Sequence, residues 1–216
     1  MTDADETAAG SDADETAAGS DADEGADHVR ADRVAVTGTP GTGKTTATAL
    51  LEGEYDVIHL NDRIKSDDDL WTERDADRDT LVADLDAVRE RLGDWSGVLD
   101  SHLAHRFDVD RVVVLRCRPE AIESRLEARG ESPETAAENA ESAEPPRALA
   151  RKARENAESE ALDVILSEAV AEHGAENVYE VDATDRDPEA VADAVRAAIE
   201  GEREPSAGTV DFIDYI

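Results

Sequence analysis

The chain has 216 residues, of which 55 are aspartate or glutamate and 22 are lysine or arginine, giving a formal net charge of -33 at neutral pH. It is long enough for one domain with a buried core, and its acidity argues against a basic patch that would bind nucleic acid directly. No apolar run approaches the roughly 18 residues that cross a bilayer, and the single cysteine, Cys117, cannot form an internal disulfide, so a cytoplasmic location without membrane attachment is expected.

Residues 1–32 are predicted to be a disordered acidic tail. The repeated segments TDADETAAG, SDADETAAG and SDADEGAD contain no apolar side chain larger than alanine, so they cannot bury a core. Beyond the tail, acidic residues run through segments with ordinary apolar periodicity, which indicates a surface adapted to high salt, as in a halophile. Residues 33–201 are predicted to fold as one domain, and residues 202–216 to form a C-terminal tail.

Short apolar runs alternate with helical patterns along this domain. The predicted buried strands are Val34–Val36, Val57–Leu60, Gly97–Leu99, Arg111–Leu115 and Val178–Val181. Apolar stripes with helical spacing comprise Leu81, Val82, Leu85, Val88 and Leu92; then Leu162, Ile165, Leu166, Ala169 and Val170; and finally Val191, Val195 and Ile199. Another helix is predicted from Pro119 to Arg129, ending at Gly130. This alternation predicts a doubly wound α/β fold with one parallel sheet.

A glycine-rich stretch follows the first predicted strand. Residues 38–45 read GTPGTGKT and match the pattern G-x-x-x-x-G-K-[ST] between a strand and a helix. Glycines at Gly38, Gly41 and Gly43 let backbone N–H groups turn toward phosphate oxygens. In this pattern Lys44 reaches the β and γ phosphates of a bound nucleotide, and the hydroxyl of Thr45 binds Mg²⁺. The alternative, a turn without a ligand, is disfavoured because both neighbouring elements are present.

Two further residues suit the chemistry of such a loop. Asp100, at the end of the predicted strand VLD, is a candidate for ordering Mg²⁺ and its waters, although a strand-end aspartate also commonly caps a helix. His102 follows it, placed to orient water or a phosphoryl acceptor. Arg125 and Arg129 share one helix face and suit phosphate oxygens, or they are surface arginines near a helix C-terminus. The absence of an N-K-x-D motif disfavours a GTPase.

Several segments together resemble one known family. They are TGTPGTGKTT, VLDSHLAH, LRCRPEAIESRLEARG, KARENAESEALDVILSEA and VYEVDATDRDPEAV, and they resemble the archaeal members of the adenylate kinase isoenzyme 6 family. The resemblance extends over nearly all of residues 33–199. It implies a P-loop nucleoside monophosphate kinase fold, with a five-stranded parallel sheet flanked by helices and a short lid at about residues 128–152, here carrying an insertion.

The resemblance also implies roles for individual positions. The ATP phosphate site would comprise Gly41, Gly43, Lys44, Thr45 and Thr46. The monophosphate-binding region would span about residues 59–82, with Asp84 just beyond it. Arg129 would reach ATP from the lid, and Asp100 and His102 would serve the metal and hydrolysis. The adenine would lie against residues 182–186, including Asp182, Thr184 and Arg186.

The expected activity is transfer of a phosphoryl group from Mg·ATP to AMP, or to a related monophosphate, giving two ADP. Water as acceptor would give ATPase activity. The resemblance also implies a role in maturation of the small ribosomal subunit. The main alternative is therefore an assembly factor that binds a small-subunit ribosomal protein or pre-ribosomal particle and uses ATP hydrolysis as a release switch. Kinase action on another small hydroxyl metabolite is a third hypothesis.

Overall fold

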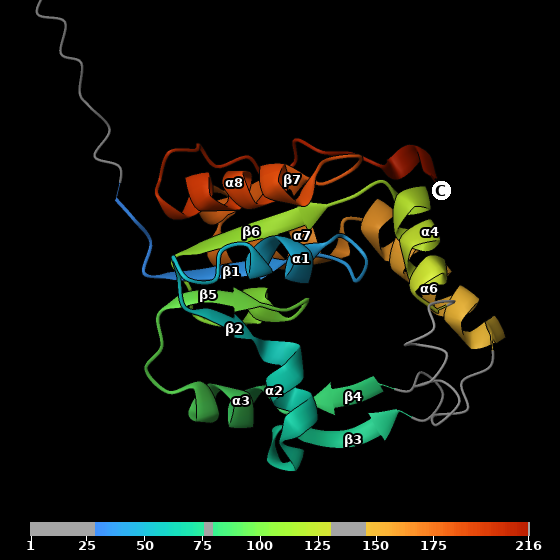
Figure 1. The fold of residues 1–216 in the computed structure, drawn as a ribbon, viewed down its shortest axis with the longest axis horizontal. Helices are drawn as coiled ribbons and strands as arrows, with labels where there is room; N and C mark the ends of the chain where they lie inside the picture. The colour runs from blue at the N-terminus through green and yellow to red at the C-terminus, as the bar shows by residue number, and fades with distance from the viewer. Residues whose placement is uncertain (1–28, 76–79, 131–145, 216) are drawn as a thin grey trace, which may run out of the picture.

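A five-stranded parallel sheet forms the centre of the computed structural model, which describes residues 29–75, 80–130 and 146–215 (Figure 1). Its strands stand in the order β2 (Val57–His59), β5 (Gly97–Asp100), β1 (Arg33–Thr37), β6 (Arg111–Arg116) and β7 (Val178–Asp182). The predicted fold class is confirmed, and each predicted strand is present, although Leu60 belongs to the helix after β2. The chain enters the glycine loop from β1, the middle strand.

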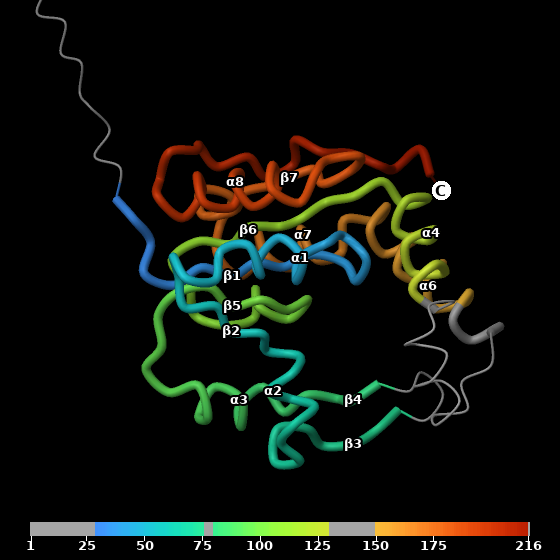
Figure 2. Tube along the Cα trace, viewed as in Figure 1, coloured from blue at the N-terminus to red at the C-terminus, as the bar shows by residue number. Residues whose placement is uncertain are grey.

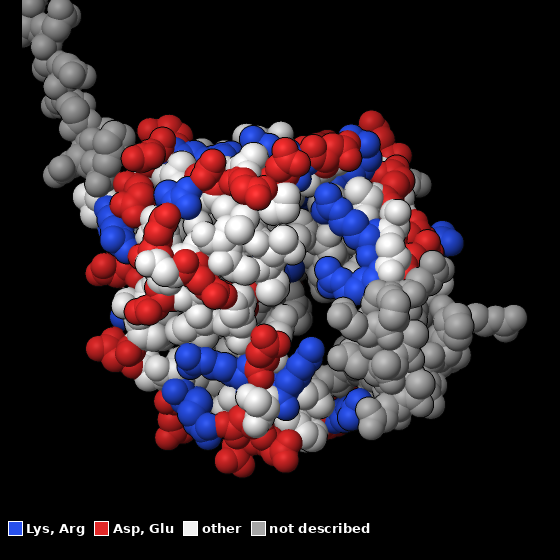
Figure 3. Space-filling view, viewed as in Figure 1, with Lys and Arg blue, Asp and Glu red and all other residues white. Residues whose placement is uncertain are grey.

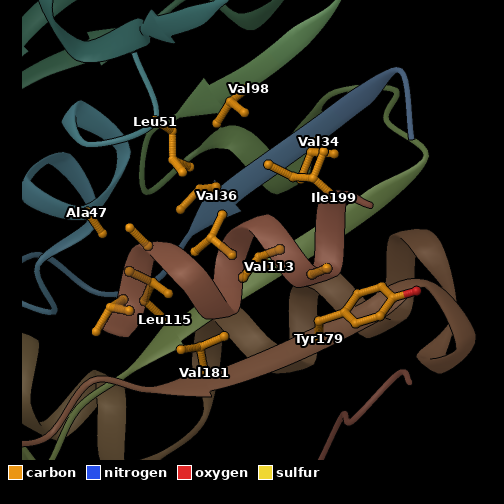
Figure 4. Close-up of a cluster of buried hydrophobic side chains, with 14 of the residues drawn as sticks. Val34, Val36, Ala47, Leu51, Val98, Val113, Leu115, Tyr179, Val181 and Ile199 are labelled. Atoms are coloured by element: carbon orange, nitrogen blue, oxygen red, sulfur yellow. The ribbon is translucent and has the colours of Figure 1, made fainter. Parts of the chain in front are cut away.

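Alternating side chains bury both faces of the sheet. Val34 and Val36 point to one face, where α1 (Lys44–Ala49) and α8 (Pro188–Ile199) cover them, as Figure 4 shows. Ala35 points to the other face, which is covered by three helices: α2 (Leu60–Ser66), α3 (Leu85–Leu92) and α7 (Val164–His173). Each fully buried Val or Leu stabilises the folded protein by roughly 1.5–3 kcal/mol, so the layers on the two faces together stabilise the sheet.

The helices agree with the sequence patterns except around Leu162. Helix α4 runs over Pro119–Gly130 and α8 over Pro188–Ile199, each with proline at its first residue. The stripe that includes Leu162 was expected to form one helix, but that residue lies between α6 (Pro146–Ala161) and α7. Asp163 separates the two helices because its backbone is left-handed, with φ of 53°.

The prediction that Leu81 and Val82 begin a helix is wrong. They belong to β4 (Thr80–Ala83), which pairs antiparallel with β3 (Trp71–Asp75) in a separate two-stranded sheet, visible below the main sheet in Figure 2. Helix α3 begins only after Asp84, whose carboxylate accepts hydrogen bonds from the backbone N–H groups of residues 86 and 87, both at 3.1 Å. This side-chain cap fixes the helix start two residues beyond the hairpin.

Helices α4 and α6 pack against each other beside the edge where the main strands end (Figure 1). The short helix η4 (Ile213–Tyr215) lies against α6, and the Tyr215 hydroxyl donates to Glu123 Oε2 on α4 at 3.3 Å. The C-terminal residues therefore lie close to the same edge (Figure 2).

Three other short 3-10 helices complete the described structure. Helix η1 (Asp68–Leu70) follows α2, η2 (Ala104–Arg106) follows β5, and η3 (Ala175–Asn177) precedes β7. None of the helices in the described part of the chain is long and apolar enough to cross a membrane. The predicted acidic tail up to residue 28 and the insertion at 131–145 lie outside the described residues.

Candidate active site

The glycine loop between β1 and α1 is closely packed at two of its glycines. Gly38 has φ of 135°, and a Cβ there would lie 2.3 Å from the Leu115 carbonyl oxygen. Gly41 has φ of 100°, and a Cβ there would lie 3.1 Å from Ile122 and 3.2 Å from Leu126 of α4. The loop is therefore held between β6 and α4, with its backbone in a conformation that L-residues rarely adopt.

Lys44 lies across the loop. Its Nζ donates to the carbonyl oxygens of Gly38 at 2.7 Å and of Thr39 at 3.0 Å, and its side chain is buried. Burial lowers the pKa of Lys44 to about 8, while the carboxylates of Asp100 and Glu160 act in the opposite direction. The ammonium group is thus charged at neutral pH and costly to bury, which favours an anion next to it.

Thr45 and Thr46 lie in the first turn of α1, after Lys44, and their side chains are exposed to solvent. The neighbouring Thr42 and Thr48 are buried, and Gly43 supplies the residue that precedes the helix. The predicted phosphate-site residues thus lie together around one loop. The hydroxyls of Thr45 and Thr46, which were predicted to bind the metal and the phosphates, are accessible to solvent.

Asp100 ends β5 and is 3% exposed. Its Oδ2 accepts from Thr48 Oγ1 at 3.2 Å and lies 2.9 Å from His59 Nδ1, whereas its Oδ1 is buried without a hydrogen-bond partner among the described residues. Burial opposes protonation of His59, but hydrogen bonds to Glu52 and Asp100 outweigh it and raise the pKa of His59. His59 is a residue that sequence reasoning placed only within the monophosphate region.

His102 lies two residues beyond Asp100 and is half-buried. Burial, followed by the positive charge of Lys44, lowers the pKa of His102 to about 4. Its imidazole is therefore uncharged at neutral pH and retains one nitrogen that can accept a proton or a hydrogen bond.

One arginine of α4, Arg125, joins the glycine loop to the turn after β7. Arg125 Nη1 donates to the Gly41 carbonyl at 3.4 Å, and its Nη2 donates to the Ala183 carbonyl at 3.3 Å. Arg129 is exposed, and its charge contributes to the lowered pKa of Lys44. Figure 3 shows a hollow at this edge of the molecule with Lys and Arg atoms along its rim.

The turn after β7 contains the residues assigned to the adenine. The Thr184 N–H donates to Asp182 Oδ1 at 2.9 Å, and Thr184 Oγ1 accepts from the Arg118 N–H at 2.8 Å. Arg186 donates to the Asp182 carbonyl at 3.4 Å. These hydrogen bonds fix the turn. Arg125 joins it to the glycine loop.

Sequence reasoning missed a buried group of charges behind the loop. Thr39 Oγ1 donates to Glu160 Oε2 at 2.6 Å, and Arg116 Nε donates to Glu160 Oε1 at 2.7 Å. Arg116 is 1% exposed and is also paired with Glu180 and Asp163. The only signals in the sequence were an arginine ending an apolar strand and a glutamate within KARENAESEA, and neither indicates a partner.

A parallel sheet whose central strand leads into a loop of this kind defines a P-loop α/β nucleotide-binding protein. Comparisons with known proteins agree. A family model described as an AAA domain matches residues 34–145. A protein named "Putative adenylate kinase" from Natronomonas pharaonis is 56% identical over 85% of this chain and 99% of its own. The same name is carried by a Halobacterium salinarum protein, 54% identical over 85% of this chain and 99% of its own.

A Methanocaldococcus jannaschii protein of that name is 34% identical over 85% of this chain and 97% of its own. Among solved structures, a deoxyadenosine kinase from M. mycoides with bound dATP aligns at a TM-score of 0.42 and 14% identity, over 76% of this chain and 97% of that chain, which carries no weight for function. The identities to the archaeal relatives are decisive: the chain belongs to this adenylate kinase-like family.

Proposed function

We propose that the protein is an adenylate kinase that transfers the terminal phosphoryl group of ATP to AMP, giving two ADP. The observation that carries the proposal is the arrangement of Lys44, buried across the glycine loop, next to the buried carboxylate of Asp100. The names of the archaeal relatives support the same reaction. In this proposal the triphosphate lies in the loop of residues 38–46.

Binding would replace the two carbonyl partners of Lys44 with phosphate oxygens. The carbonyls of Gly38 and Thr39 accept hydrogen bonds from the ammonium group but carry no net charge. Negatively charged phosphate oxygens would therefore be favoured over them. Backbone N–H groups of the loop and the exposed hydroxyls of Thr45 and Thr46 supply the remaining donors. Arg129 would add charge from α4, and catalysis would consist of positioning and charge neutralisation.

The residues present fit Mg²⁺. Asp100 Oδ1 is a buried carboxylate oxygen without a partner in the described part of the chain, and Thr45 offers an exposed hydroxyl on the neighbouring element. The described residues contain no group of three His, Cys, Asp or Glu side chains that would form a protein-only site, as expected for an ion that keeps several waters and phosphate oxygens. When bound, Mg²⁺ would neutralise charge on the transferred phosphate.

The acceptor would bind on the side of α2 and the β3–β4 hairpin, within residues 59–82. Residues 182–186 would bind the adenine of ATP, because Arg125 connects their turn to the phosphate loop. A cytoplasmic location completes the proposal, because the single cysteine needs no oxidising compartment.

One assay tests this function. The protein is incubated in molar KCl with Mg²⁺ and ATP, with and without AMP, and ADP and free phosphate are measured separately, with Lys44→Ala as the inactive control. We expect AMP to drive ADP formation without matching release of phosphate. ADP formation at the level of Lys44→Ala would exclude the kinase.

A second candidate function is ATP hydrolysis, favoured by the uncharged His102 close to Lys44. A neutral imidazole can accept a proton from water or orient it. In the same assay, hydrolysis predicts phosphate release that does not depend on AMP and that falls in His102→Ala. A role in small-subunit maturation, with a ribosomal protein as partner, is supported by the resemblance alone.

A further inference from the structure

We propose that Glu160, near the end of α6, is a positioning residue that sets the phosphate loop through Thr39 and links the loop to the C-terminal segment. This inference rests on the proposed ATP site but not on the identity of the phosphoryl acceptor. It assigns a function to a group of buried charges that the proposed reaction does not itself use.

Both carboxylate oxygens of Glu160 are engaged. Oε2 accepts from Thr39 Oγ1 at 2.6 Å, while Oε1 accepts from Arg116 Nε at 2.7 Å and from the Cys117 N–H at 3.1 Å. Thr39 is 1% exposed and Glu160 is 3% exposed, so water does not compete for these contacts. The carboxylate therefore cannot rotate without losing hydrogen bonds in a medium of low polarity, where such losses are costly.

Thr39 is the loop residue through which this restraint acts. Its carbonyl accepts from Lys44 Nζ at 3.0 Å, from Thr42 Oγ1 at 2.9 Å and from the Thr42 N–H at 3.2 Å. When Lys44 turns toward phosphate, Thr39 loses one of these three partners. The hydroxyl bond to Glu160 then holds Thr39, and with it the first half of the loop, in the shape that receives the phosphates.

Glu160 is in turn fixed by Arg116. This guanidinium has ion pairs with Glu160, Asp163 and Glu180, so three carboxylates surround one positive charge. The excess of negative charge is balanced in part by Lys44, because the Glu160 carboxylate raises the pKa of that lysine against the effect of burial. The loop lysine and the Arg116 group thus belong to one electrostatic unit.

The same group reaches the end of the chain. Glu180 Oε2 accepts from the Thr209 N–H at 2.6 Å and from the Val210 N–H at 3.3 Å, and the Arg116 guanidinium lies 5.5 Å from the ring centre of Phe212. Contacts therefore run without a break from residues 209–212 through Glu180, Arg116 and Glu160 to Thr39. The C-terminal segment is part of the support of the phosphate loop.

A purely structural role for Glu160 predicts a different result from a positioning role. Thr39→Val removes the hydroxyl that bonds to Glu160, keeps the shape of the side chain and leaves every ion pair of Arg116 in place. Thr39→Ser keeps the hydroxyl and serves as the matched control. If the contact only stabilises the fold, Thr39→Val lowers the melting temperature while binding of nucleotide to the folded protein is unchanged.

The experiment measures direct binding of ATP to the full chain by isothermal titration calorimetry in molar KCl, together with melting temperature. We expect Thr39→Val to bind ATP about tenfold more weakly, because a hydrogen bond to a charged group is lost, and Thr39→Ser to bind within about twofold of the wild-type protein. In the kinase assay the KM for ATP should rise in Thr39→Val, with the KM for AMP within about twofold.

Equal ATP affinity in Thr39→Val and the wild-type protein would overturn the inference, as would equal weakening in Thr39→Ser. Binding is measured without AMP, so the outcome is independent of the reaction. If the wild-type protein binds ATP but makes no ADP from AMP, the kinase proposal fails and the comparison of the two variants still decides the role of Glu160. If the wild-type protein does not bind ATP, both proposals fail.

Discussion

Around the glycine loop several polar side chains are buried and hydrogen-bonded, whereas the β3–β4 hairpin consists of half-buried and exposed side chains. Lys44, Asp100 and Glu160 are each at most 7% exposed. Lys44 donates to two carbonyls of the loop itself, whereas Asp100 and Glu160 have hydrogen-bond partners from other segments. In β3 and β4 no residue among Trp71–Asp75 and Thr80–Ala83 is fully buried. The proposed ATP side is thus supported by buried contacts, and the proposed acceptor side is less tightly packed.

Removing the positive charge of Arg116, at the centre of the buried ion pairs behind the glycine loop, should have the largest effect on stability. In Arg116→Met the carboxylates of Glu160 and Glu180 stay buried without a positive partner, so we expect the free energy of unfolding to fall by about 3–5 kcal/mol. Urea unfolding in molar KCl measures the change.

The matched control is Arg154→Met, which loses an exposed ion pair to Glu158 at 3.0 Å and should cost at most about 1 kcal/mol. Equal stability of the two variants would mean that the charges behind the loop are not coupled as the structure indicates.

Asp100→Asn should lower the rate of ADP formation by about 100-fold or more, because a neutral amide cannot order Mg²⁺ and its waters as a carboxylate does. The Mg²⁺ concentration needed for half-maximal rate should rise as well. Asp110→Asn, at the opposite end of the sheet, should keep the wild-type rate and Mg²⁺ dependence. An unchanged Mg²⁺ dependence in Asp100→Asn would remove this residue from the metal site.

The pH dependence of kcat/KM for ATP tests the role of Lys44 on the proposed ATP side. The pKa of Lys44 is lowered to about 8 by burial, so the free protein loses this positive charge as the pH rises through that value. We expect kcat/KM for ATP to fall above about pH 8, while kcat at saturating ATP falls only at higher pH, since bound phosphates stabilise the charged form. A kcat/KM profile that is flat to pH 10 would contradict the proposed role of Lys44.

The smallest effect is expected on the hairpin side. Asp84→Ala removes the side-chain cap of α3 and should cost about 1 kcal/mol of stability. Because the hydrogen bonds that the structure describes for Asp84 join it to Leu70 and to the start of α3 and not to the glycine loop, the affinity for ATP should stay within about twofold of the wild-type value. A large loss of ATP affinity in this variant would show that the two sides are not independent.

The residues that sequence reasoning found are those with local signals. Spacing within eight consecutive residues identified the loop of residues 38–45, and apolar runs identified the strands that support it. Glu160 and Thr39 stand 121 positions apart, and Arg116 and Glu180 stand 64 apart, so only the folded chain shows that they meet. The error at Leu81 and Val82 had a different cause.

Those two residues and Leu85, Val88 and Leu92 fit helical spacing, but so does a strand followed by a helix when a turn of suitable length joins them. The local signal that was overlooked is Asp84, an aspartate in the middle of the stripe and a good residue to precede a helix.

The contacts of Glu180 with Thr209 and Val210 have a consequence for how the protein is made. A chain is synthesised from its N-terminus, so residues 38–45 emerge from the ribosome well before residues 209 and 210. The backbone groups that bond to Glu180 are therefore added long after the loop sequence itself. Until those residues are made, the growing chain has the loop sequence without the complete set of contacts behind it, and the final packing of the loop has to wait for a distant segment.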